Sequence, residues 1–236
     1  MAFCASAAYL IVILLVTPAV AISASDRVAM AGFAIDRNEV TIGEFAAFAE
    51  ASKLKTAAER EGGGHEWEGG WKRRRGWWFR TPFGAAPQTT AEPAVHVTWH
   101  EAQNYCASVG GQLPTRDEWR RAAYREEGGG STAGFVMGTT YPYPTGADPE
   151  GANTNGADQW PRHAARGMTR QGVNGLYDMG GNVWEWLADL DGVNALTAGG
   201  SWWYGSEKMR EDEMQWKPAD LYVVYIGFRC AYDMRS

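Results

Sequence analysis

The 236-residue sequence lacks a surplus of positive charge. Lys and Arg number 22 against 28 Asp and Glu, and the formal net charge is −6. A nucleic-acid-binding scaffold needs a basic surface that displaces counterions, so we expect no nucleic-acid partner. One basic run, "WKRRRGWWFR" at 71–80, interleaves Arg with Trp and could stack on bases or clamp an anion. A solvated loop whose aromatic rings pack inward is the interpretation we favour for it.

The sequence also lacks an apolar run long enough to span a membrane. The apolar stretch 7–16 is short for a span, and Pro18 and the small residues 19–21 follow it. This pattern predicts a secretory signal peptide over 1–24 with cleavage near 21–24, although the first ten residues carry no Lys or Arg. We therefore expect an exported mature chain, 25–236, that is periplasmic and has no membrane partner after cleavage.

Cysteine is scarce, with three in the whole chain. Removal of the signal peptide takes Cys4 with it and leaves Cys106 and Cys230. Two thiols in an oxidising compartment most often form one disulfide. A catalytic thiol is the sharper alternative, but neither cysteine has a nearby His in the sequence or another sign of activation. The sequence therefore favours a disulfide.

No internal repeat or linker divides the chain, and local signals predict short elements joined by long loops. Helix starts are expected at Thr41, Thr98 and Thr115, because a Glu follows each of them three residues later and forms a capping box. Strands are expected within 94–99 and 221–232. Segments rich in Gly, Pro, Asn and Trp separate these elements, at 62–96, 128–175 and 199–219. We predict one mixed α+β domain with long ordered loops.

Two oxygen-rich segments could bind a cation that orders such loops. "GANTNGADQWP" offers Asn153 and Asp158, and "YDMGGNVWEW" offers Asp178 and Glu185. Ca²⁺ binds carboxylates mixed with backbone carbonyls, which both segments can supply. Asx-turns and helix caps without any metal explain these residues equally well.

Two other clusters are weaker candidates. His96 and His100 are four residues apart, but Thr98 caps a helix between them, so we expect the two rings to diverge rather than bind zinc. Segment 59–70 gathers four Glu around His65. A flexible Gly-rich loop is a poor platform for acid–base catalysis, so we regard this cluster as the rim of a site.

The order of the motifs resembles that of a known family. "DRNEVTIGEFAAFAE", "PAVHVTWHEAQNYCASVGGQLPTRDEWRRAA", "YPYPTG", "NGLYDMGGNVWEW", "GGSW" and "IGFRCA" follow one another as in the formylglycine-generating enzyme (sulfatase-modifying factor) family. The resemblance covers the mature chain. It implies a single domain of that family's fold, related to C-type lectins and poor in regular secondary structure.

The resemblance also implies structural sites. Cys106 and Cys230 fall where the family has a disulfide. Two structural calcium sites are implied by motif position, and the spacing around Asp158 is shorter than is usual in the family. Their ligands would be Asn153, Thr154, Asp158 and Trp160 for the first site, and Asp178, Gly181, Val183 and Glu185 for the second.

The segment after "GGS" departs from the family pattern. Formylglycine generators carry two copper-binding cysteines there, where this chain has Tyr204 and Met209. A soft-metal site needs thiolates, so the resemblance does not imply formylglycine generation. The family's iron-dependent branch uses a three-His site on an additional N-terminal domain that these residues do not include. The sequence is most similar to the PvdO-type branch, periplasmic proteins that act on the siderophore precursor ferribactin in the oxidation completing the pyoverdine chromophore. The redox cofactor is not indicated.

A ligand pocket is expected around 201–210. Aromatic rings there suit stacking on a flat ring, and polar neighbours could supply hydrogen bonds or proton transfer. The expected binding residues are Trp184, Ser201, Trp202, Trp203, Tyr204 and Met209, and the catalytic candidates are Tyr204, Glu207 and Arg210. The alternatives are a non-catalytic, lectin-like binding module and a partner protein for other periplasmic maturation enzymes.

Overall fold

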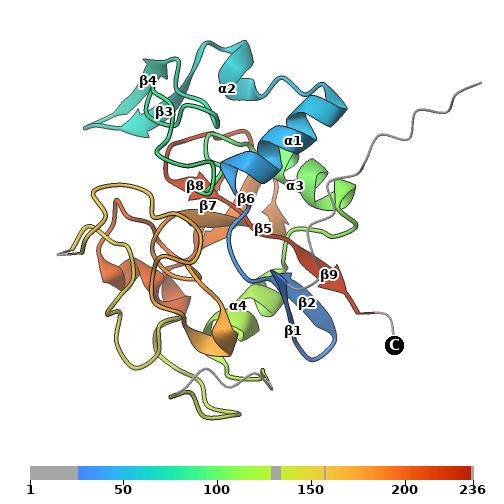
Figure 1. Ribbon diagram of the computed structural model, residues 1–236, viewed down its shortest axis with the longest axis vertical. Helices are drawn as coiled ribbons and strands as arrows, with labels where there is room; N and C mark the ends of the chain where they lie inside the picture. Colours follow the sequence, from blue (N-terminus) through green and yellow to red (C-terminus); the bar gives the residue numbers. More distant parts are fainter. Residues whose placement is uncertain (1–25, 129–133, 157, 235–236) are drawn as a thin grey trace, which may run out of the picture.

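The structure is a computed structural model that describes residues 26–128, 134–156 and 158–234. The predicted signal peptide, 1–24, lies outside these residues. Within them, no helix combines the length and the apolar character that crossing a membrane requires. Short helices, small sheets and long loops make up one body (Figure 1). This architecture confirms the predicted α+β class.

Capping boxes open the helices where the sequence predicts them. α1 (Ile42–Ser52), α3 (Trp99–Ser108) and α4 (Arg116–Tyr124) each start after a Thr whose hydroxyl accepts the N–H of a Glu three residues later. α2 (Ala57–Arg60) starts in the same way at Thr56 and was not predicted. The capping box of Thr56 and Glu59 is as clear in the sequence as the other three.

Three sheets carry the strands. The central sheet has the order β7 (Gln215–Pro218), β6 (Asn194–Ala198), β5 (Trp184–Asp191), β8 (Ile226–Gly227). A second sheet joins β1 (Arg27–Ala29), β2 (Phe33–Asp36) and β9 (Ala231–Asp233), and β3 (Gly63–Trp67) pairs with β4 (Trp71–Arg75). β5 and β8 pair in parallel, and this pairing joins two segments that are distant in the sequence.

The two predicted strands need correction. Residues 94–98 form no strand, because this buried stretch turns at His96, with φ 57°, into the N-cap of α3. The segment 221–232 is broken, since β8 belongs to the central sheet and β9 begins in the second sheet. Both segments are apolar because they are buried, and burial alone does not make a strand.

The basic run and the acidic segment before it form a hairpin rather than two loops. β3 pairs antiparallel with β4 in a register that sets Glu66 opposite Lys72 and Trp67 opposite Trp71. Arg74 forms ion pairs with Glu66 and Glu68. The sequence did not predict this pairing because the segment is rich in Gly, which is uncommon in strands. Oppositely charged side chains face each other across the two strands and favour the pairing. The hairpin projects from one end of the molecule beside α2 (Figure 1).

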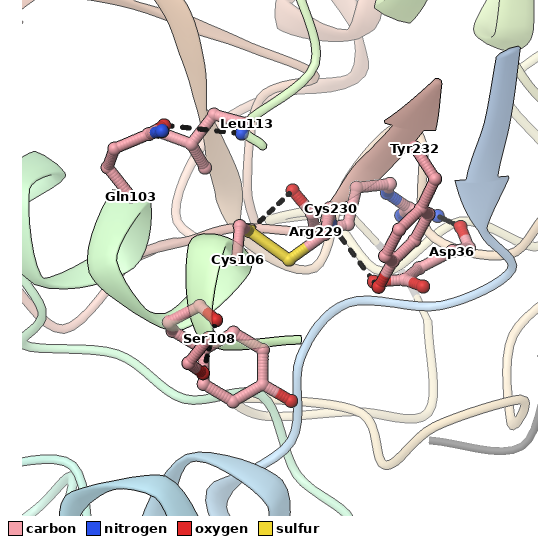
Figure 2. Close-up of a disulfide and its surroundings, with 9 residues drawn as sticks. Asp36, Gln103, Cys106, Ser108, Leu113, Arg229, Cys230 and Tyr232 are labelled. Carbon is pink, nitrogen blue, oxygen red and sulfur yellow. Dashed lines mark hydrogen bonds between the residues drawn. A yellow bond between two sulfur atoms is a disulfide. The ribbon is translucent and has the colours of Figure 1, made fainter. Parts of the chain in front are cut away.

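A disulfide between Cys106 and Cys230 closes a long loop of the chain. Cys106 on α3 and Cys230, just before β9, are joined with 5.5 Å between their Cα atoms and a sequence separation of 124. Asp36 lies beside the bond and accepts the N–H of Cys230, at 3.0 Å (Figure 2). The bridge therefore ties the middle of the chain to its last strand.

Candidate functional site

The segment after β6 is held in a tight path by its glycines. Gly200 has φ 74°, and a Cβ there would lie 3.1 Å from the carbonyl atoms of Lys208, so this crossing favours glycine. A turn closes where the N–H of Tyr204 donates to the carbonyl of Ser201, at 2.9 Å. The carbonyl of Tyr204 accepts the N–H of Asn155, at 3.0 Å. This frame presents Trp203 and Tyr204 on one face.

Trp203 and Tyr204 line a cavity of about 380 Å³. Its walls come from the hairpin, from β7 and from the residues before β8. The lining residues are Trp67, Trp71, Trp203, Tyr204, Trp216, Lys217, Pro218, Leu221 and Tyr225. The size suits a small aromatic molecule, and most of the lining is apolar with few polar groups, as ligand sites generally are.

Four of the tryptophans on this cavity are exposed. Trp203 is 38% exposed, and Trp67, Trp71 and Trp216 are 45–50% exposed. Large aromatic side chains gathered on one exposed face are typical of binding sites and are rare elsewhere on soluble proteins. Their clustering favours a ligand-binding role over core packing.

The rings are arranged for stacking. Trp203 lies nearly parallel to Tyr225, with centroids 6.5 Å apart and an interplanar angle of 24°. Tyr204 meets Tyr225 edge-on at 5.8 Å, and its other neighbour, the buried Trp184, lies at 5.7 Å. A flat ligand ring can pack against Trp203 while polar groups reach the hydroxyls of the tyrosines.

The two tyrosine hydroxyls stay protonated at neutral pH. Burial raises the pKa of Tyr204, although its hydrogen bond with Tyr225 acts in the opposite direction. Burial also raises the pKa of Tyr225. The Tyr225 hydroxyl donates its hydrogen bond to Tyr204, so the Tyr204 hydroxyl is the one that can donate a hydrogen bond to a ligand oxygen. Neither phenol is poised as a base.

Other expected binding residues lie outside the lining. Trp184, Ser201 and Met209 are at most 1% exposed, and Trp184 packs edge-on against Tyr204 of the lining. Trp202 is partly buried and packs edge-on against Phe83, with centroids 6.0 Å apart.

Glu207 and Arg210 do not join Tyr204 in the cavity. Both are exposed, on or just after the short 3₁₀ helix η3 (Ser206–Met209). Arg210 lies 3.4 Å from Asp212 in a surface ion pair. Among the three catalytic candidates, the structure therefore brings only Tyr204 into the lining.

Sequence reasoning missed most of the remaining lining. Trp67 and Trp71 meet across the hairpin with centroids 5.3 Å apart. Trp216 and Lys217 come from β7, which the sequence did not predict as a strand. Alternation in "QWKP" is a weak signal, and no local pattern predicts that β7 and the hairpin face each other.

The two histidines diverge as the sequence indicates, whereas the glutamate cluster lies on α2 and the β3–β4 hairpin and not on the flexible loop that we expected. His96 is fully buried and its Nε2 lies 2.9 Å from the carbonyl of Pro82, while His100 is exposed near Asp220. His65 is on β3, where its ring packs against Tyr222 at 4.9 Å. Over the described ranges, no three His, Cys, Asp or Glu side chains converge as a metal cluster.

The first predicted calcium site has residues that fit a cation. Asn153 is fully buried, and its Oδ1 atom has no hydrogen-bond partner within the described part of the chain. The Asp158 carboxylate accepts the N–H groups of Thr154 and Trp160, both at 2.8 Å, and retains further lone pairs. An orphaned amide oxygen close in sequence to a carboxylate is a donor set that Ca²⁺ can use.

The second predicted site has a different cation. Arg229 donates to both Glu185 oxygens at 2.6–2.9 Å, and the Trp119 indole donates to Oε2 at 2.7 Å. Both charged partners are fully buried. A guanidinium already compensates Glu185, so these side chains do not fit a calcium ion that needs both Glu185 oxygens.

Asp178 belongs to the same buried cluster. Burial raises its pKa to about 6, and its Oδ1 accepts the Thr169 hydroxyl at 2.7 Å. Glu39 lies nearby, and burial raises its pKa too. Arg229 is the cation that these carboxylates face, and the cluster joins the loop at 178–183 to β5.

Comparison with known proteins assigns the family. Residues 16–234 match the family described as "Sulfatase-modifying factor enzyme 1-like domain". The chain belongs to this family. The match spans all of the described residues, and it confirms the resemblance seen in the order of the motifs.

Relatives within the sulfatase-modifying factor family are diverse. The inactive C-alpha-formylglycine-generating enzyme 2 of Bos taurus is 28% identical over 244 residues, covering 84% of this chain and 76% of the relative. A hercynine oxygenase of Mycobacterium tuberculosis is 28% identical over 196 residues, covering 68% of this chain and 42% of that protein. The structure of PvdO from Pseudomonas aeruginosa superposes with a TM-score of 0.63 at 22% identity, covering 86% and 80% of the two chains. The last comparison confirms the fold.

Proposed function

We propose that this protein acts in the periplasm in the oxidative maturation of an aromatic siderophore precursor, the step that completes the pyoverdine chromophore from ferribactin. One observation carries the proposal. The position where formylglycine generators hold their reactive cysteines bears Tyr204 and opens into the aromatic cavity. An aromatic cavity suits a substrate that contains a flat ring.

The site's own residues would bind and orient the ring. Trp203, stacked against Tyr225, offers an exposed face, and the hairpin residues Trp67 and Trp71 close the opposite wall. Tyr204 keeps its proton and would donate a hydrogen bond to an oxygen on the ring. These contacts hold the substrate in one orientation and exclude water from its faces.

The proposed reaction is a two-electron dehydrogenation. The substrate ring loses two hydrogens, that is two electrons and two protons, as one new double bond forms. Dioxygen is the acceptor that we assign, and its reduction by these two electrons and two protons gives hydrogen peroxide. A hercynine oxygenase among the relatives indicates that the family includes proteins named for oxygen chemistry.

The experiment is turnover of ferribactin by the purified mature protein in air. The proposal predicts growth of the chromophore's visible absorbance, consumption of oxygen, and loss of both under nitrogen. Trp203→Ala should slow turnover by about 5- to 150-fold, from lost stacking of about 1–3 kcal/mol. Leu190→Ala is the matched control, since Leu190 is 51% exposed and does not line the cavity.

A non-catalytic binding module is the second candidate, favoured by the open tryptophan rim. A binding module should bind ferribactin in a way that depends on Trp203. It should form no oxidised product from ferribactin, whichever oxidant is supplied, and should take up no oxygen. Binding without turnover, in the presence of periplasmic extract from a producing strain, would replace the oxidative proposal with this one.

A further inference from the structure

Lys217 distinguishes this cavity from a purely aromatic one. It lies on β7, whose register pairs it with Ala195 of β6, and it lines the cavity beside Trp216. Among the residues that the structure describes, it is the one charged side chain in the lining. Its place in a paired strand fixes its backbone beside the rings.

The ammonium group is not compensated by a carboxylate. Within the described ranges, no Asp or Glu lies within ion-pair distance of Lys217. Its Nζ donates to the Oε1 atom of Gln215 at 2.7 Å and lies 4.8 Å from the centroid of the Trp184 ring. An ammonium has three donors, so this arrangement leaves hydrogen-bonding capacity for a ligand.

The groups around the Lys217 ammonium do not neutralise its charge, which favours an anionic ligand. Lys208 is nearby and repels it, but Lys208 is itself paired with Glu213 at 2.5 Å. The tyrosines of the lining, Tyr204 and Tyr225, remain neutral because burial raises their pKa values. Burial lowers the pKa of Lys217 to about 8, which shows that its charge is poorly solvated.

We propose that Lys217 is the specificity-determining residue of the cavity, which selects aromatic ligands carrying an anionic oxygen, a carboxylate or a phenolate, over neutral ones. The proposal rests on the proposed function, because it names the substrate class of the same cavity. The ring packs on Trp203, and the anionic oxygen accepts a charge-assisted hydrogen bond from Nζ. Lys217 is here a binding residue and takes no part in bond making.

The test is calorimetric titration of the full mature protein with 2-naphthoate and 2-naphthamide at pH 7. These probes share a ring system and differ in charge. The proposal predicts that the wild type prefers naphthoate by on the order of tenfold, as a charge-assisted bond allows. Lys217→Met should abolish the preference without changing naphthamide affinity, and Lys217→Arg should retain it. Lys72→Met removes the same charge from exposed strand β4 and should leave the preference intact.

A second readout separates binding from a structural role. At pH 8.5, naphthoate should restore the proton that burial removes from Lys217, because a bound anion favours the ammonium form. Titrations in buffers of different ionisation enthalpy should show proton uptake in the wild type and none in Lys217→Met.

The outcomes separate the two proposals. If both probes bind equally, or Lys217→Met keeps the preference, the role of Lys217 is wrong while the aromatic cavity stands. If neither probe binds and Trp203→Ala leaves both the affinity for ferribactin and its turnover unchanged, the cavity itself is misassigned and both proposals fail.

Discussion

Replacing Arg229 by Met tests how the loops beneath the site are held. The guanidinium donates to Glu185 and to the carbonyls of Asp36, Arg37 and Tyr177 at 2.8–3.2 Å, and it is fully buried. Removing one partner of a buried ion pair costs about 3–5 kcal/mol because the other charge remains buried. Domains are stable by about 5–15 kcal/mol, so the variant should lose about a fifth or more of its stability.

A double-mutant cycle makes this reasoning specific. Glu185→Gln removes the stranded charge and keeps an oxygen for the Trp119 indole, so the double variant should be more stable than Arg229→Met alone. The assay is urea unfolding followed by tryptophan fluorescence. A loss below about 1 kcal/mol for Arg229→Met, or a double variant no better than the single one, would refute the account.

Three further predictions concern stability. Calcium at a hundredfold its dissociation constant should stabilise the protein by about 2.7 kcal/mol, so a chelator should lower the melting temperature. An unchanged melting temperature, together with no metal found by elemental analysis, refutes a calcium site. Replacing Cys106 and Cys230 by Ala should cost about 2–5 kcal/mol, and two alkylatable thiols in untreated periplasmic protein would contradict the bond. His163→Gln should be destabilising at pH 7, and the gap to wild type should narrow by about 2 kcal/mol at pH 5. Burial lowers the pKa of His163 to about 3, so the stability that depends on its neutral form is full above pH 6.5 and is lost progressively as the pH falls toward 3. A gap that stays constant between the two pH values is the contrary result.

Local signals in the sequence predicted what depends on a few neighbouring residues. A capping box needs a Thr and a Glu three residues apart, so the starts of α1, α3 and α4 were predictable. The positions of Trp203 and Tyr204 followed from the motif that precedes them. Both predictions rest on short stretches whose conformation is set within one turn.

The remaining features depend on contacts between distant segments. The hairpin was missed because its two strands meet through contacts across a Gly-rich segment, such as the ion pair of Arg74 on β4 with Glu66 on β3. Lys217 was missed because only the pairing of β7 with β6 brings it to the cavity. The engagement of Glu185 by Arg229, 44 residues away, has no local signature. Register and long-range pairing are therefore what the sequence alone could not supply.

Ferribactin affinity and melting temperature, measured on the same Trp203→Ala protein, test the central claim most directly. The account predicts binding weaker by on the order of tenfold or more, from a stacking loss of about 1–3 kcal/mol. It also predicts a nearly unchanged melting temperature, since Trp203 is 38% exposed and supports little of the core. Leu190→Ala should change neither quantity. A Trp203→Ala protein that melts far earlier while its folded fraction binds ferribactin as tightly as wild type would contradict the account.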